Sequence, residues 1–497
     1  MMYTYNQPTK MKARHLVIQN AVENLTLNRQ SSAIVQRNYV RSVYDYFQSK
    51  EEISNTKKEI EEIDFKYIID WEKLHDVKVK KKSPEELTVC YLCGPEPDND
   101  FKEFTNLGIL PQNIWAFENN KSCYDAALKA YEQGMYPQPR IIKQKIDSFF
   151  INTPKSFDIV YFDACSTLIS EQHSLKSIRT LFQYNRLESI GVLITNFSAP
   201  DLSADNQELC KFIAFYLYFK KENAEEIKLN DKNICNIEYT QLLQQVKDNF
   251  DKYYSAFISY VIRDLGSVLV PIQKINTNTY FSKLFKKNAD QVENYSSLFQ
   301  QAKNNNLAKM IFSAKFLQDN DVHSKIFDLF FNDIGSLDAL FDCFKVLINM
   351  QQGTINIDDS LKEITDYFES GQIYNFLDTV HRNMFFDIVL NQLTYPMHYN
   401  NKNNYRYNYI AKHNHMYMDL TVFDECRYIY EWLPAMHQIK SAFLNKSWQY
   451  VFRFALDGLV KSRKDYNNEL FFQGTVISER EKQFSTAKIK SREKIGR

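Results

Sequence analysis

The sequence predicts an α/β fold built on a parallel sheet, and two observations within residues 88–198 support this prediction. Four short apolar runs, at 89–93, 114–118, 157–163 and 191–196, alternate with segments of helical character. Parallel strands require this alternation, because a helical crossover must return the chain before the next strand begins. Polar residues follow the runs, at the end of the sheet where such folds bind their ligands.

Helices are expected before this region. Apolar residues recur at helical spacing between residues 11 and 47, and the charge-rich segment 51–62 forms an exposed helix or a linker. Across the first fifty residues the cations outnumber Glu23 and Asp45, so one helix face is basic. Such a face either meets phosphates or is solvated. The cations are Lys10, Lys12, Arg14, Arg29, Arg37, Arg41 and Lys50.

Within the α/β region, the first strand ends in a turn at Gly94, the second in Glu118 and the fourth in Asp163. We expect a third strand at 140–146, just before Asp147. A helix follows at 208–221. Three further segments, at 257–263, 267–275 and 277–281, resemble strands and are expected to complete the sheet.

Beyond about residue 287 the pattern becomes helical. Apolar residues between Leu337 and Ile348 lie at helical spacing after Ser336, a possible cap, and a similar group at 361–368 precedes Gly371. The expected organisation is a helical N-terminal extension (1–83), a Rossmann-like domain (84–286) and a mostly helical C-terminal domain (287–497). The apolar stripes of the flanking helices need burial, so we expect them to pack around the sheet domain.

Composition sets wide limits on function. The 497 residues carry a formal net charge of zero, which gives no global sign of a nucleic-acid or membrane protein. No apolar run approaches the roughly 18 residues of a membrane span, and the first residues lack the apolar core of a signal peptide. A cytoplasmic protein with no membrane partner is expected. Its eight cysteines are scattered, and Cys90 and Cys93 lie in a predicted strand as core residues.

A strand that ends in a glycine turn before a helix brings backbone N–H groups to a ligand. A carboxylate that ends the next strand can accept hydrogen bonds from both ribose hydroxyls of a nucleoside. Gly94 and Glu118 have this relation in the sequence. The three-glycine motif that a dinucleotide requires is absent, so dinucleotide binding is not expected.

These residues resemble the motifs of class I S-adenosylmethionine-dependent methyltransferases, over about 88–281. The first motif resembles the stretch from Val89 to Pro97, and the second resembles Glu118 at its strand end. The resemblance implies a Rossmann-like methyltransferase sheet with a late antiparallel hairpin. It also implies S-adenosylmethionine as cofactor, held by Gly94, Glu96, Glu118, Asp147 and Asp163.

Departures from the family pattern leave two functions open. One glycine survives in the first motif, where Pro95 and Pro97 remove amide donors. The first function is methyl transfer to a macromolecule, with Asp163 and His173 as candidates for contact with the acceptor. Each of these site residues has a structural alternative, such as helix capping by Asp147 or Asp163. The second function is a catalytically inactive scaffold or sensor that binds a partner through the C-terminal helices.

The acceptor is expected to be nucleic acid, RNA or DNA. The segment from Tyr395 to Tyr417 interleaves aromatic and basic residues, which suits stacking on single-stranded bases, although a polar loop is equally consistent with it. These residues are Tyr399, Tyr405, Tyr407, Tyr409, Lys402, Arg406 and Lys412. His413 and His415 with Asp419 resemble metal ligands, but no further ligand accompanies them, so no metal is expected.

Overall fold

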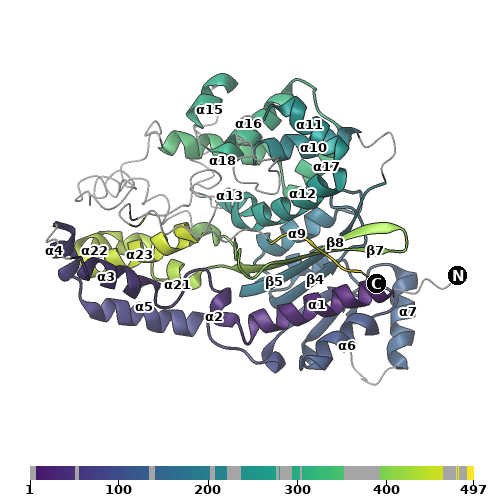
Figure 1. Cartoon of the computed structure of the whole chain (residues 1–497), viewed down its shortest axis with the longest axis horizontal. Coiled ribbons are helices and arrows are strands. Elements are labelled where there is room, and N and C mark those ends of the chain that lie inside the picture. Colours follow the sequence, from purple (N-terminus) through teal and green to yellow (C-terminus); the bar gives the residue numbers. More distant parts are fainter. Residues whose placement is uncertain are drawn as a thin grey trace.

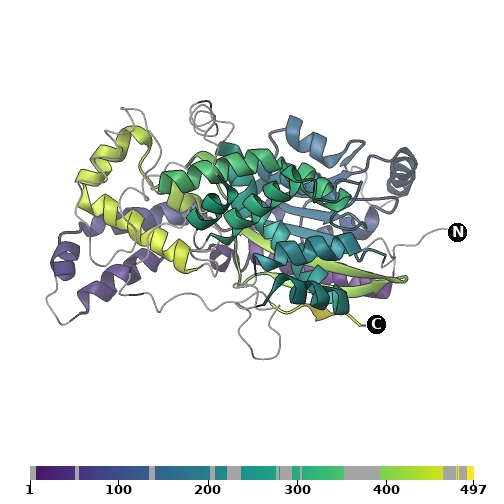
Figure 2. The same cartoon turned by 90° about the horizontal axis from the view of Figure 1, so that it is seen from above.

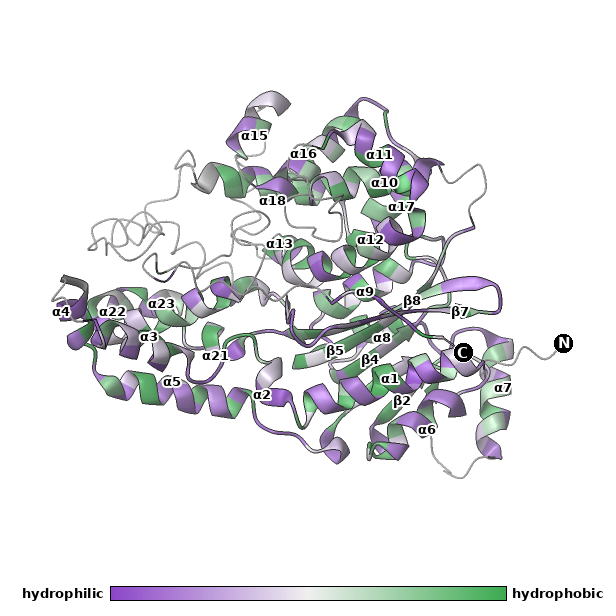
Figure 3. Ribbon diagram, in the orientation of Figure 1, coloured by the Kyte–Doolittle hydropathy of each residue, from purple (hydrophilic) through white to green (hydrophobic). Residues whose placement is uncertain are grey.

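A mixed sheet forms the centre of the molecule, with helices on both faces and a lobe of helices at one end (Figure 1). The computed structural model describes residues 7–50, 55–133, 140–201, 207–220, 237–275, 279, 294–302, 305–351, 392–462, 477, 480 and 490–496. Hydrophobic residues are concentrated on the central strands and on the inner faces of many helices (Figure 3).

The strand order confirms the predicted Rossmann-like fold class. Five parallel strands lie in the order β3-β2-β1-β4-β5, which is the order of a doubly wound nucleotide-binding sheet. An antiparallel hairpin, β7 and β8, continues the sheet beyond β5. The strands are β1 (Val89–Leu92), β2 (Ile114–Phe117), β3 (Arg140–Ile142), β4 (Phe157–Asp163), β5 (Leu187–Ser198), β6 (His398–Tyr399), β7 (Tyr405–Ala411), β8 (Asn414–Asp424) and β9 (Glu493–Lys494).

Two of the three predicted late strands are wrong. Residues 257–263 lie in α12 (Phe250–Asp264), and 267–275 lie in a π-helical turn (Leu265–Leu269) and α13 (Val270–Ile275). This long helical stretch is buried on all sides, so its apolar residues show no helical stripe. The hairpin comes instead from residues 405–424, so the sheet includes chain beyond residue 286. Most of the predicted segment 277–281 lies outside the described residues, as does the predicted helix at 361–368.

Helices α1 (Pro8–Leu25), α6 (Asp98–Asn106) and α7 (Lys121–Glu132) cover one face of the sheet, and α8 (Ile146–Asn152), α9 (Ser174–Gln183) and α12 cover the other (Figure 1). Helix α1 crosses β5, β7 and β8 and packs against α6. The stretch Phe250–Ile275 is long and apolar enough to span a membrane, and its most apolar part is buried inside the protein.

Two groups of helices extend the fold. Helices α3 (Tyr39–Gln48) and α5 (Phe65–Lys78) pack against helix α23 (Lys446–Lys461), so segments far apart in the sequence build the lobe seen in Figures 1 and 2. The second group comes between β5 and β7 in the sequence and lies above the sheet in Figure 1. It contains α10 (Gln207–Tyr218), α11 (Tyr239–Asp248), α15 (Tyr295–Gln301), α16 (Asn306–Asp319), α17 (Lys325–Ile334) and α18 (Leu337–Gln351), the last starting after Ser336 as predicted.

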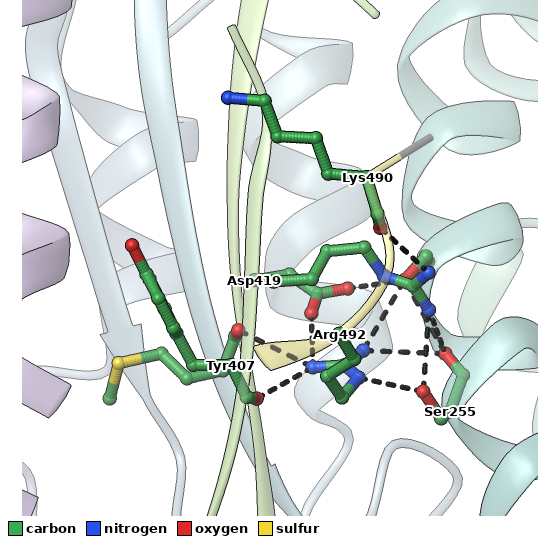
Figure 4. A network of polar contacts seen from close by, with 8 residues as sticks. Ser255, Tyr407, Asp419, Lys490 and Arg492 are labelled. Atoms are coloured by element: carbon green, nitrogen blue, oxygen red, sulfur yellow. Dashed lines mark hydrogen bonds and ion pairs between the residues drawn. The ribbon is translucent and has the colours of Figure 1, made fainter. Parts of the chain in front are cut away.

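The C-terminal segment is tied to the sheet by a buried polar network (Figure 4). Strand β9 pairs with the edge strand β7. Next to it, Arg492 forms an ion pair with Asp419 of β8, with 2.5 Å between Nη1 and Oδ1, and donates from Nε to Ser255 Oγ of α12 at 2.7 Å. Arg406 of β7 donates to the carbonyl oxygen of Ser255 at 3.2 Å. Ser259 of α12 also donates to Asp419, so one carboxylate connects the tail, the hairpin and the buried helix.

Candidate functional site

A cavity of about 510 Å³ lies at the carboxyl ends of β1, β2, β3 and β4. The loops after β1 and β4 leave neighbouring strands toward opposite faces of the sheet, which is the switch point where doubly wound folds bind ligands. All six site residues predicted from the sequence line this cavity. They are Gly94, Glu96, Glu118, Asp147, Asp163 and His173.

The loop after β1 contributes backbone to the cavity. Gly94 has a φ of +57°, a left-handed conformation that a residue with a side chain adopts at a cost. No atom lies within 4 Å of the position that a Cβ would take there, so the loop presents an open surface. Glu96 also lines the cavity, and its Oε2 accepts a hydrogen bond from Asn99 Nδ2 at 2.8 Å. The turn therefore leaves room for a ligand to approach the backbone.

The carboxylate of Glu118 lies directly after β2 at the cavity wall. Its backbone N–H donates to Ile142 of β3, which fixes the residue at the end of the sheet. Oε1 accepts a hydrogen bond from the backbone N–H of Asn120 at 2.7 Å. A carboxylate offers about four acceptor positions, so capacity remains for the paired hydroxyls of a ribose.

Asp147 was predicted to follow a strand directly, but it lies in a helix. Strand β3 ends at Ile142, and Asp147 is the second residue of α8. Its Oδ1 accepts from the backbone N–H of Ser148 at 2.8 Å, one of the donors that a helix start leaves unpaired. The residue still lines the cavity, so its part in the helix start and its predicted contact with a ligand are compatible.

Both oxygens of Asp163 are engaged by protein groups. Oδ2 forms an ion pair with Lys10 of α1 at 2.9 Å, and Oδ1 accepts from Asn196 Nδ2 at 2.8 Å and from Cys165 Sγ at 3.2 Å. Burial by itself would raise the pKa of Asp163, but Lys10 and these hydrogen bonds hold it below its usual value. The carboxylate stays ionised and is a weak base.

A second ion pair connects α1 to the cavity. Arg14 Nε lies 2.6 Å from Oδ1 of Asp100 in α6, and both side chains are buried. Burial raises the pKa of Asp100 to about 6, although the Arg14 guanidinium opposes this shift. Neither alternative proposed for the basic face holds for Lys10 and Arg14, which are buried against carboxylates. The sequence does indicate that these two cations are buried, because Lys10 and Arg14 continue the apolar stripe of Val17 and Ala21 at helical spacing.

His173 precedes α9 and has a φ of +55°, again in the left-handed region. Its Nδ1 lies 2.6 Å from Oδ1 of Asp333 at the end of α17. The side chain of Asp333 is 3% exposed, whereas that of His173 is 50% exposed and lines the cavity. Sequence reasoning missed Asp333, because 160 residues separate it from the histidine.

The segment 395–417 does not form an open surface of aromatic and basic side chains. Tyr407, Tyr409 and Arg406 are buried within the sheet. A nucleic-acid partner stays a prediction, and these three residues give it no support. His413 and His415 are exposed at the hairpin turn, while Asp419 is paired with Arg492. In the described part of the chain, no three His, Cys, Asp or Glu residues are grouped to hold a metal ion.

No family model matches the chain, and no curated protein matches it. It is similar to solved structures of a S-adenosylmethionine-dependent methyltransferase from Clostridium acetobutylicum ATCC 824 (20% identity, TM-score 0.19) and a putative caffeoyl-CoA O-methyltransferase from Staphylococcus aureus (15%, 0.20). A third is the plantazolicin methyltransferase BpumL in complex with SAH (10%, 0.21).

The matches cover 32%, 47% and 54% of this chain, respectively. They cover 58% of the first structure's own length, 91% of the second and 94% of the third. These likenesses are distant, and the fold assignment rests on the order and direction of the strands.

Proposed function

We propose that the cavity binds S-adenosylmethionine and that the protein transfers its methyl group to an acceptor. One observation carries the proposal: Gly94, Glu118 and Asp147 follow three neighbouring parallel strands and line a single cavity. Its volume of about 510 Å³ falls within the range of about 300–1,000 Å³ typical of small-molecule sites.

The residues fit the chemical groups of this cofactor. Glu118 has acceptor capacity for the ribose hydroxyls, and the open turn at Gly94 lets a ligand lie against the backbone. Asp147 and its neighbours Lys145 and Ile146 line the part of the cavity that follows β3, where the adenine ring is proposed to lie. The bound cofactor would supply a methyl group activated by a sulfonium, so the protein has mainly to position the reactants.

Asp163 is proposed to hold the N-terminal helix over the cavity, a role that its contacts favour over proton transfer. Its oxygens already accept from Lys10, Asn196 and Cys165. A carboxylate with a lowered pKa accepts a proton poorly near neutral pH. Of the two residues predicted to contact the acceptor, His173 has the exposure that such a contact needs.

Isothermal titration calorimetry of the full chain tests the proposal. S-adenosylmethionine and S-adenosylhomocysteine should each bind at one saturable site, and NAD⁺, the comparison ligand, should not. Absence of binding at millimolar concentrations of both ligands would contradict the proposal. A partner-binding scaffold with this fold would then be the better account.

A further inference from the structure

We infer that His173, oriented by Asp333, accepts the proton of a hydroxyl group that receives the methyl. The inference rests on the proposed function and adds the chemical class of the acceptor. It also gives the helical insertion between β5 and β7 a part in the site, because Asp333 belongs to α17. Asp333 is a positioning residue, since it acts through the histidine.

The contact between the two side chains defines which ring nitrogen carries the proton. Nδ1 of His173 lies 2.6 Å from Oδ1 of Asp333. An ionised carboxylate can only accept, so Nδ1 donates and the neutral ring keeps its lone pair on Nε2. This arrangement, a histidine held by a buried carboxylate, orients the ring and stabilises it once it is protonated.

The two side chains of the pair differ in their exposure. Asp333 is enclosed, whereas half of the His173 side chain is exposed at the cavity. Lys176 and Arg179 of α9 also face Asp333, and Glu171 is near the histidine. Glu171 forms an exposed ion pair with Lys325 at 2.6 Å, so α17 contacts this loop at two points. Of these two contacts, the one to the buried Asp333 is what orients the histidine.

A base of this kind indicates an acceptor that is weakly acidic. A neutral amine attacks a methyl group through its own lone pair, whereas a hydroxyl is a poor nucleophile until its proton is removed. In the proposed step the hydroxyl oxygen forms a bond to the methyl carbon, and the carbon–sulfur bond breaks with its electron pair remaining on sulfur. The hydroxyl proton moves to Nε2 of His173. Charge and atoms balance without a further reactant.

The pair is tested first without an acceptor. The ¹⁵N signals of the histidine-labelled full chain, assigned with His173→Gln, report which ring nitrogen of His173 carries the proton. Asp333→Asn should reduce the fraction of rings protonated at Nδ1, because a neutral amide oxygen accepts from this nitrogen more weakly than a carboxylate does.

Asp328→Asn is the matched control. Asp328 lies on the same helix and contacts a different histidine, His323, at 3.5 Å. It should leave the ring signals of His173 unchanged. Both variants should bind S-adenosylhomocysteine within about twofold of wild type by calorimetry, so a failure of cofactor binding is distinguished from a failure of this inference. Unchanged ring signals of His173 in Asp333→Asn would overturn the role of the pair.

The acceptor class is tested with methyl-labelled S-adenosylmethionine and cell extract. Wild type should place label in methoxy groups, which hot hydriodic acid releases as iodomethane. His173→Gln should lower the amount of released label at least about tenfold. Label found only in N-methyl or S-methyl products would overturn the assignment. No labelled product, from protein that binds S-adenosylhomocysteine, would overturn it as well.

Discussion

Lys10 of α1 forms an ion pair with Asp163 at the end of β4, with 2.9 Å between Nζ and Oδ2. The two side chains are 7% and 8% exposed, so the pair is formed almost entirely away from water. It joins the first helix of the chain to the fourth strand of the sheet, at the wall of the cavity. Two charges buried together support the structure only as a pair, because either charge alone would be uncompensated.

Lys10→Met should therefore lower the free energy of unfolding by about 3–5 kcal/mol, the cost of leaving one member of a buried pair. Lys12→Met is the matched control, because Lys12 lies on the same helix and is exposed. Urea denaturation of both variants measures the difference. The double variant Lys10→Met with Asp163→Asn should recover part of the loss, and a loss below about 1 kcal/mol in Lys10→Met would contradict the assignment.

The same pair predicts a pH dependence. Burial alone would lower the pKa of Lys10, but the Asp163 carboxylate raises it above its usual value, while the pKa of Asp163 is lowered. The contribution of the lysine is lost as pH rises through its folded-state pKa. That of the carboxylate is lost as pH falls through its own folded-state pKa. In Lys10→Met, Asp163 is buried without its cation and its pKa rises. The penalty of Lys10→Met should thus be largest between neutral pH and about pH 10, and shrink as pH falls and Asp163 takes up a proton. Urea titrations at several pH values check this.

The parts of the fold that local signals specify were predictable. The runs ending at Gly94, Glu118 and Asp163 are short, apolar and followed by turn or polar residues, and each is a strand next to the cavity. These strand ends can be recognised from residues that are neighbours in the sequence. The segment 250–275 carries no comparable signal, because a helix buried on all sides and a buried strand have the same apolar composition.

Pairings between distant residues were not predictable in the same way. Strand β8 lies against β5 in a register that joins Ile190 to Asp424, and no local pattern reports such a register. The aromatic residues of β7 were therefore interpreted as a binding surface, although they are part of the core. Asp333 reaches His173 only because α17 packs on α9.

Glu118→Ala should weaken S-adenosylmethionine binding by about 1.5–3 kcal/mol, the range for hydrogen bonds to a charged group. This corresponds to roughly 10- to 150-fold in the dissociation constant measured by calorimetry. Stability should change little, since the carboxylate is partly exposed at a strand end. Asp125→Ala, an exposed residue of the following helix α7, is the control. Equal affinities for the two variants would remove Glu118 from the cofactor site.

Gly94→Ala should affect binding more than folding. The φ of +57° costs an alanine about 1–2 kcal/mol, but its methyl group would meet no protein atom within 4 Å. The methyl group would instead occupy the face of the loop that a cofactor approaches. We expect affinity for S-adenosylhomocysteine to fall by about tenfold or more, about 1.4 kcal/mol. Gly496→Ala, which also meets no atom and lies outside the cavity, should bind as wild type does.

The tail provides the last prediction. Arg492 is buried against Asp419 and donates to the carbonyl oxygen of Tyr407 at 2.8 Å, so its removal leaves a buried carboxylate with Arg406 as its remaining nearby cation. Arg492→Met should lower the free energy of unfolding by about 3 kcal/mol or more. Lys494→Met, two residues further on and exposed, should stay within about 0.5 kcal/mol of wild type.

Urea denaturation decides between two accounts of this segment. If β9 were a loosely attached edge strand, both variants would behave alike, because strand pairing does not depend on either side chain. If the ion pair is what holds the segment, only Arg492→Met loses stability. Combining it with Asp419→Asn, which removes the unpaired charge, should then restore part of the loss. The hairpin and α12 meet at this carboxylate, so we expect the restoration to appear in the global unfolding transition.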